Sequence, residues 1–206
     1  WLMVIIPLLG LTYYSVVAGW GLAYVVEAVQ GTFTGISGDD SNQLFNSLTA
    51  DPLRLAIWHG IFMAVTVFIV ARGVNAGLEK AASLMTPALF VILIILVVYG
   101  MFAADFSAGF HFLFNMDFSK ITGKTVLMAL GQAFFSLSIA VGVMMTYGAY
   151  LPKDVSLPKA AATVALADTA VALLAGLAIF PVVFASGLAP DSGPGLIFVT
   201  MPVALG

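Results

Sequence analysis

Polar side chains cluster inside one otherwise apolar stretch of the sequence. Gln132, Ser136 and Ser138 stand among Ala, Phe, Leu and Ile, with Gly131 and Gly142 on either side. Inside a membrane each polar group without a hydrogen-bond partner is costly, so something must satisfy these side chains. Small residues also let membrane helices approach closely, and serine can bond to its own helix backbone. Helix packing and ligand binding therefore both remain open as explanations.

A discontinuous helix is the sharper hypothesis for this stretch. Its unwound centre would expose carbonyl oxygens to a cation, and the ends of its two half-helices would face a substrate. The uncharged stretch 125–152 is long enough for two half-helices. This hypothesis needs support from outside the stretch.

Asp168 is the only charged residue in the apolar stretch 160–190. A carboxylate inside a membrane helix costs free energy, so it usually faces a partner, a water-filled cavity or an ion. The alternative is that Asp168, nine residues after Lys159, lies close enough to the cytoplasmic end of its helix to reach water. We expect a functional carboxylate.

Two tyrosines and one histidine lie in other apolar stretches. Tyr13 and Tyr14 are too deep for an interfacial belt, so each hydroxyl needs either a helix bond or a ligand carboxylate. His59 has no second His or carboxylate three or four residues away that could complete a metal pair, which favours a packed histidine.

Composition excludes several classes of function. The chain has no Cys, and its His59 and His111 belong to no metalloprotease motif or other catalytic constellation, so we expect no enzyme. Its net charge is −3 and it has no basic run, so we expect no nucleic-acid partner.

The elements that must position these residues are membrane helices. Of the 206 residues 62% are hydrophobic and 8% charged, against about 25% charged residues in soluble domains. A bilayer span needs about 20 apolar residues, and the charges separate five such stretches. We therefore expect an all-α, polytopic transmembrane bundle forming one domain over 1–206. Its expected spans are 1–29, 54–71, 79–104, 125–151 and 159–187.

Charges in the loops predict the orientation. Loop 30–53 contains Asp and no Lys or Arg, whereas Arg72 with Lys80 and Lys153 with Lys159 mark the cytoplasmic side. The outer loops are then 30–53, 105–124 and 188–206, although two lysines in the second of these weaken the asymmetry. Five phenylalanines in 105–124 favour a short helix at the membrane surface. We expect a multi-pass protein of the inner (plasma) membrane, in contact with lipid.

A family resemblance rests on motifs that occur in order along the chain. They are Tyr13-Tyr14 with Gly19-Trp20, Arg72-Gly73-Val74 with Gly77-Leu78-Glu79-Lys80, residues 132–138, Thr146-Tyr147-Gly148-Ala149-Tyr150, and Gly193-Pro194-Gly195-Leu196-Ile197-Phe198. The chain resembles the neurotransmitter:sodium symporter family and is most similar to its bacterial amino-acid transporters. The resemblance implies part of a LeuT-like inverted-repeat fold, covering the third to seventh helices. The chain would then be an internal fragment whose partners include the remaining helices of the same protein.

The resemblance also implies roles for single residues. Tyr14 would donate its hydroxyl to the substrate carboxylate. Phe135 would be the aromatic lid of the gate, and Gln132 would steady that gate. Ser136 and Ser138 would lie in the unwound stretch that meets the substrate ammonium. Ser136 would also ligate sodium.

The substrate side chain would lie against Val141 and Gly10, whose modest sizes leave room for a large side chain.

Asp168 departs from the family pattern. The match places it where many members have a sodium-binding Asn. Animal members require chloride near this site, and bacterial members substitute an acidic group, so the resemblance implies that Asp168 balances sodium and that transport is independent of chloride. The expected function is sodium-coupled symport of an amino acid, with a hydrophobic or aromatic substrate, by alternating access. A helical channel and a non-transporting membrane scaffold are the alternatives.

Overall fold

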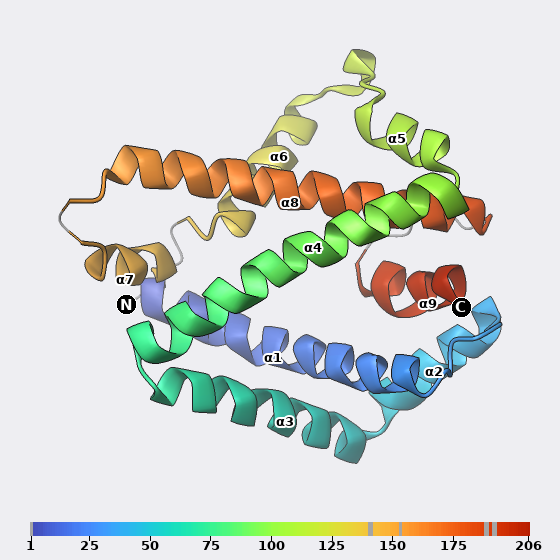
Figure 1. Cartoon of the computed structure of the whole chain (residues 1–206), viewed down its shortest axis with the longest axis horizontal. Coiled ribbons are helices and arrows are strands. Elements are labelled where there is room, and N and C mark those ends of the chain that lie inside the picture. The colour runs from blue at the N-terminus through green and yellow to red at the C-terminus, as the bar shows by residue number, and fades with distance from the viewer. Residues whose placement is uncertain (1, 140–141, 153, 188–189, 191–192) are drawn as a thin grey trace.

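The described part of the protein is helical throughout. The computed structural model describes residues 2–139, 142–152, 154–187, 190 and 193–206, and within these ranges it contains helices and no strand. Figure 1 shows long helices running across the molecule, with shorter helices at their ends. The prediction of an all-α, polytopic fold is confirmed.

Four helical stretches are individually long and apolar enough to cross a membrane. They lie in α1 (Leu2–Val29), in α3 (Pro52–Ala71), in α4 (Lys80–Ala103) together with the π-helical turn η1 (Val74–Glu79), and in α8 (Leu157–Ala185). The start of α3 shows how local sequence sets a boundary. The Asp51 side chain accepts hydrogen bonds from the backbone nitrogens of Leu53 and Arg54, at 2.9 and 3.1 Å, and Pro52 occupies the first turn.

The expected fourth span, 125–151, is divided into two helices. Helix α6 (Gly123–Ser136) ends in a turn, and α7 (Val143–Ala149) begins after it. Ser138 and Gly142 have positive φ angles of 52° and 78°, which a right-handed helix cannot continue through. The hypothesis of an interrupted helix is thus confirmed in the described residues, which exclude 140 and 141.

Shorter helices lie in the expected outer loops. They are α2 (Gly38–Ala50), α5 (Phe106–Phe114), η2 (Phe118–Lys120), η3 (Leu196–Thr200) and α9 (Met201–Leu205). Helix α5 is the short phenylalanine-rich helix that the sequence predicts. Loops 30–53 and 105–124 are therefore structured.

Glycines allow the closest helix contacts. A Cβ on Gly19 of α1 would lie 3.0 Å from the backbone nitrogen of His59 on α3. A Cβ on Gly109 of α5 would lie 2.5 Å from Cγ of Pro181 on α8. These two contacts fix how α1 packs on α3 and how α5 packs on α8.

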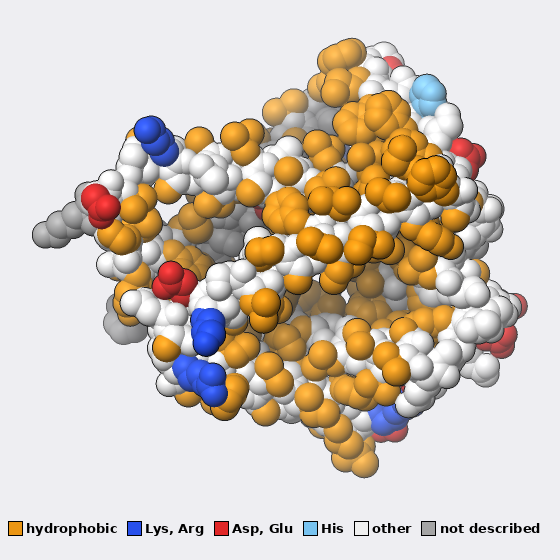
Figure 2. Space-filling model, in the orientation of Figure 1, with side chains coloured by type: hydrophobic (Ala, Val, Ile, Leu, Met, Phe, Trp, Pro, Cys, Tyr) orange, Lys and Arg blue, Asp and Glu red, His pale blue; other side chains and the backbone are white. Residues whose placement is uncertain are grey.

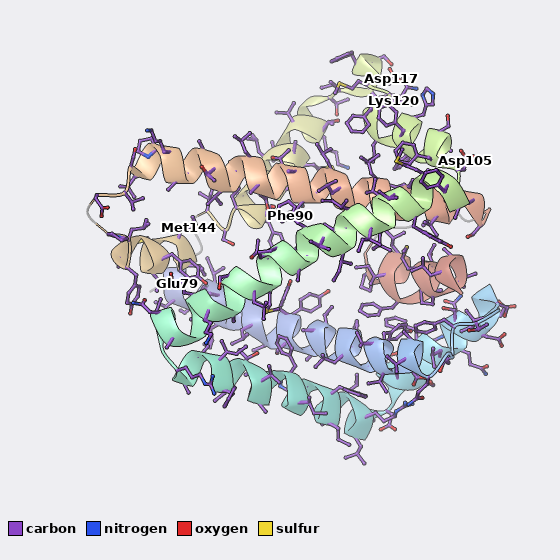
Figure 3. The ribbon with its side chains drawn as sticks, viewed as in Figure 1. Glu79, Phe90, Asp105, Asp117, Lys120 and Met144 are labelled. Carbon is purple, nitrogen blue, oxygen red and sulfur yellow. The ribbon has the colours of Figure 1, made fainter. Side chains whose placement is uncertain are left out.

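Most apolar side chains lie on the surface. Figure 2 shows hydrophobic side chains across the middle of the molecule, with charged side chains mainly toward its two ends. Glu79 and Asp105 illustrate this separation at opposite ends of α4 (Figure 3). A soluble domain does not expose apolar surface this continuously, so the structure supports an integral, multi-pass membrane protein.

Candidate ion and substrate site

Ser136 and Asp168 form a direct contact between two helices. The Ser136 hydroxyl donates a hydrogen bond of 2.6 Å to Oδ2 of Asp168. The donor is the last residue of α6, and the acceptor lies in α8, 32 residues later in the chain. This length is typical of a hydroxyl bonded to a charged carboxylate. The structure thus joins two residues for which the sequence predicts sodium binding.

Asp168 lies well inside α8. The helix begins at Leu157, so the rise of an α-helix places Asp168 about 16 Å along it. The residue is half-buried, and its carboxylate contacts the interrupted helix. A position three turns inside α8, bonded to another helix, supports the functional interpretation of Asp168 over a carboxylate at the helix end.

The turn after Ser136 is held by backbone hydrogen bonds. The Leu137 nitrogen donates to the Ala133 oxygen at 3.1 Å, and the Ile139 nitrogen donates to the Phe134 oxygen at 2.9 Å. The carboxyl end of a helix carries partial negative charge, which favours a cation. Ser136 therefore stands where the helix end and the Asp168 carboxylate both attract positive charge.

Ser138 adopts a backbone conformation that side chains other than glycine's disfavour. Its φ is +52°, and its nitrogen donates to the Phe135 oxygen at 3.1 Å. Such a conformation costs on the order of 1–3 kcal/mol and is concentrated at functional sites. The cost is consistent with a break at which backbone groups contact a ligand.

The oxygen chemistry of this pair suits a hard cation. A hydroxyl, a carboxylate and a helix end offer oxygen ligands, which alkali and alkaline-earth ions prefer over softer ligands. Among the described residues no group of three or more His, Cys, Asp and Glu side chains could hold a metal ion. Sodium therefore fits this pair better than a transition metal does.

The other predicted site residues are not assembled around this pair. Tyr14 and Gly10 are exposed on α1, and Gln132 and Phe135 are exposed on α6. Within the described residues, the Tyr14 hydroxyl forms no side-chain hydrogen bond with the 132–138 stretch. Ser138 is half-buried in the turn. Val141 lies outside the described residues.

Ion pairs lie elsewhere. The Glu27 carboxylate is 3.6 Å from Arg54, and Asp117 is 3.3 Å from Lys120. The labels in Figure 3 show Asp117 and Lys120 side by side, away from α8. Hydrogen bonds from the Ser119 hydroxyl and nitrogen, followed by Lys120, lower the pKa of Asp117. The first pair joins α1 to α3, and the second lies around η2, so neither belongs to the candidate site.

The sequence did not indicate a second inter-helix contact. Ser41 in α2 donates its hydroxyl to the Val199 backbone oxygen in η3 at 2.9 Å. Ser41 is fully buried, although the α2 sequence is mostly polar. No pattern in that sequence separates Ser41 from its exposed neighbours.

Comparison with known proteins identifies the family. Residues 43–206 match the Sodium:neurotransmitter symporter family. The chain belongs to this family. The predicted family resemblance is therefore confirmed, and the family is named for symport rather than for an enzymatic activity. The symporter family comprises polytopic membrane proteins, as the helices of this chain also indicate.

Several relatives are named as sodium-dependent transporters. The chain is 42% identical over 202 residues to an uncharacterized sodium-dependent transporter of Bacillus subtilis strain 168, covering 98% of the chain and 45% of the relative. It is 32% identical to an uncharacterized sodium-dependent transporter of Haemophilus influenzae, over 94% of the chain and 43% of the relative. A third relative, the sodium-dependent nutrient amino acid transporter 1 of Drosophila willistoni, is 29% identical over 68% of the chain and 23% of its own length.

The chain spans less than half the length of these symporter-family relatives. No solved structure matches the chain.

Proposed function

We propose that the protein to which this chain belongs is a sodium-coupled symporter of an amino acid. The observation that carries this proposal is the bond between Ser136 and Asp168 at the break between α6 and α7. Its oxygens would bind sodium, and the backbone of the turn would face the substrate. The sodium-dependent transporters among the relatives support the choice of ion.

Coupling would arise because ion and substrate share one site. Sodium bound beside Ser136 and Asp168 would raise the affinity for the substrate, and the substrate would raise the affinity for sodium by the same factor. The Asp168 carboxylate would balance the charge of sodium without chloride. The sodium gradient would then drive uptake across the inner (plasma) membrane.

Substrate recognition would use the interrupted helix and α1. The Tyr14 hydroxyl would donate to the substrate carboxylate, while Ser136 and Ser138 would lie beside its ammonium group. Phe135 would cover the bound substrate, and Gln132 would steady the gate. Tyr14 and Phe135 are exposed and could therefore contact further helices or a substrate.

A large hydrophobic or aromatic amino acid is the proposed substrate. The surroundings of Gly10 support a large substrate side chain, because no atom outside its own helix lies within 4 Å of a Cβ built at this position. Val141 would form the rest of this subsite. The relative in Drosophila willistoni, named a nutrient amino acid transporter, supports the amino-acid class.

Alternating access would follow from bending at the break between α6 and α7. The turn at 137–139 lies between two rigid helices, so rotation there would move one half-helix relative to the other. The remaining helices of the same protein would complete the site. This motion distinguishes a symporter from a helical channel or a membrane scaffold.

Uptake by the full-length protein in proteoliposomes tests the function. A panel of amino acids should include a large apolar or aromatic member whose uptake is saturable and requires an inward sodium gradient. Replacing sodium by potassium should abolish accumulation. Flux that grows linearly with concentration would indicate a channel, and the absence of flux and of sodium-dependent binding would indicate a scaffold.

A further inference from the structure

Charged side chains flank helix α5 (Phe106–Phe114) at both of its ends. Asp105 caps the first turn, where its carboxylate accepts a hydrogen bond of 3.0 Å from the Ala108 nitrogen. Beyond the last turn, Asp117 pairs with Lys120 at 3.3 Å. Charges are costly inside a bilayer, so we expect both ends of α5 at a depth that water reaches. A helix of nine residues is about 14 Å long and cannot cross the hydrocarbon core, so α5 should lie along the membrane surface.

Contacts with α8 fix the rotation of α5 about its own axis. Gly109 faces Pro181, and a Cβ on Gly109 would lie 2.5 Å from Cγ of that ring. Leu113 covers Gly176, and its Cδ2 would lie 3.0 Å from a Cβ built on that glycine. Both contacts join residues of this chain, so the packed face of α5 is defined without reference to the remaining helices of the protein.

A strip of phenylalanine rings lies beside this packed face. Phe106, Phe110 and Phe114 are spaced four residues apart, which places their side chains along one flank of the helix. The ring centroids are 6.3 Å apart for the first two residues and 4.7 Å apart for the last two. The three rings therefore form one continuous apolar surface, the phenyl strip.

A polar row follows the phenyl strip around the helix. Ser107, His111 and Asn115 each come one residue after a phenylalanine of the strip, so each lies about 100° further round the axis. All three residues are exposed. The order around α5 is thus the face packed on α8, then the phenyl strip, then the polar row. When the polar row faces water, this order turns the phenyl strip toward the membrane.

Lipid suits the phenyl strip better than another helix does. Helix contacts inside membranes favour small residues, as Gly109 and Gly176 illustrate, and the strip has none. The strip also adjoins the end of α4, where Met101 and Phe102 are exposed in a stretch long and apolar enough to cross a membrane. Figure 2 shows hydrophobic side chains continuing from α4 over the region of α5. The strip therefore extends the surface that we expect to face lipid.

We propose that α5 is a surface helix that inserts its phenyl strip into the lipid of the bilayer, while α8 holds its packed face. The sequence predicts a short helix at the membrane surface, and the structure separates the side chains that enter the lipid from those that face water. Through Gly109 and Pro181, the inserted strip would tie the end of α8 to the membrane surface. The proposal goes beyond the transport function, because it uses none of the residues assigned to sodium or substrate.

Spin labelling of the full-length protein, in vesicles of phosphatidylethanolamine and phosphatidylglycerol, tests the insertion. This chain contains no cysteine, so single cysteines can be introduced once any cysteines elsewhere in the protein are replaced. Molecular oxygen concentrates in lipid and a nickel chelate stays in water, so collisions with each report the surroundings of the label. For Phe106→Cys, Phe110→Cys and Phe114→Cys we expect frequent oxygen collisions, a loss of nickel collisions, and a label depth of about 5–10 Å into the interface.

Each of these variants has a matched control one residue further along the helix. Ser107→Cys, His111→Cys and Asn115→Cys should show the reverse pattern, with frequent nickel collisions and few oxygen collisions. Leu113→Cys, which lies against Gly176, should show the pattern of a label covered by protein, with few collisions of either kind. The three pairs are independent, so a variant that fails to fold leaves two pairs to decide the outcome.

Alternation between oxygen and nickel collisions within the pairs supports the insertion of the phenyl strip. Few collisions of either kind at the phenylalanine positions, as at Leu113, would show that another part of the protein covers the strip, and would overturn the proposal. Frequent nickel collisions there would place the strip in water and overturn it as well. Neither result would bear on the sodium site, because no residue of that site is changed.

Discussion

The Ser136 hydroxyl donates a 2.6 Å hydrogen bond to the Asp168 carboxylate, joining the end of α6 to the interior of α8. This contact links the break in one helix to the single carboxylate within another. A cation bound there would interact with both helices at once. Sodium could thereby change how the two helices sit against each other.

Removing the Ser136 hydroxyl should weaken sodium binding. We expect Ser136→Ala to raise the sodium concentration for half-maximal substrate binding about tenfold, which corresponds to about 1.4 kcal/mol for one lost oxygen ligand. Ser136→Thr, which keeps the hydroxyl, should stay near wild type. Scintillation proximity binding at a series of sodium concentrations measures this. Ser83→Ala, which removes a local bond on α4, is the control, and an unchanged sodium dependence in Ser136→Ala would remove Ser136 from the site.

Neutralising Asp168 should change the response to chloride. The carboxylate would supply the negative charge beside sodium, so wild-type uptake should be the same in chloride and in gluconate. Asp168→Asn should lose uptake or require chloride for it. If wild-type uptake rises steeply with chloride and Asp168→Asn leaves it unchanged, the assigned role is wrong.

The Tyr14 hydroxyl should contribute more to substrate affinity than the Tyr13 hydroxyl does. Tyr14→Phe should weaken substrate affinity about tenfold or more, because a hydrogen bond to a charged carboxylate is worth roughly 1.5–3 kcal/mol. Tyr13→Phe is a close control, since both side chains are 64% exposed and lie in α1. Isothermal titration of the full-length protein measures the affinities. Equal affinities in the two variants would contradict the assignment.

Substrate binding should not require the Ser138 side chain, but it should require the backbone conformation of Ser138. Glycine adopts positive φ readily, so Ser138→Gly should retain substrate binding. Ser138→Val should lower affinity at least about tenfold, because a β-branched residue disfavours this conformation. Substrate binding by both variants provides the measurement. Normal binding by the valine variant would show that the turn is not needed in this form.

Gly109 should be required for the packing of α5 on α8. A Cβ there would lie 2.5 to 2.7 Å from Pro181 atoms, and the ring cannot move without moving α8. We expect Gly109→Ala to destabilise the protein by about 1–3 kcal/mol. Thermal unfolding of the full-length protein in detergent measures this effect.

Gly60→Ala is the control for Gly109→Ala. Gly60 lies inside α3, and no atom outside its own helix lies within 4 Å of a Cβ built there. Alanine should therefore leave stability unchanged or raise it by up to about 1 kcal/mol. An equal or higher unfolding temperature for Gly109→Ala would show that α5 and α8 do not pack this closely.

The sequence by itself determined the helical class, the family and the helix boundaries where local rules act. Uninterrupted apolar runs require helices in a membrane, and the cap at Asp51 needs only neighbouring residues. The polar cluster at 132–138 also indicated an interruption, because helix continuity is a local property. The resemblance to the symporter family also followed from the sequence alone, because its motifs occur in order along the chain.

Tertiary structure decided which distant residues meet. The angle at which helices cross decides whether Ser136 meets Asp168 and whether Ser41 meets Val199. Close packing, such as that of Gly109 against Pro181, sets this angle. Apolar periodicity cannot predict how a helix crosses its neighbours when that helix is apolar on every side, as α8 is. For this reason the sequence predicts that Asp168 is a functional carboxylate, whereas only the fold places Ser136 2.6 Å from it.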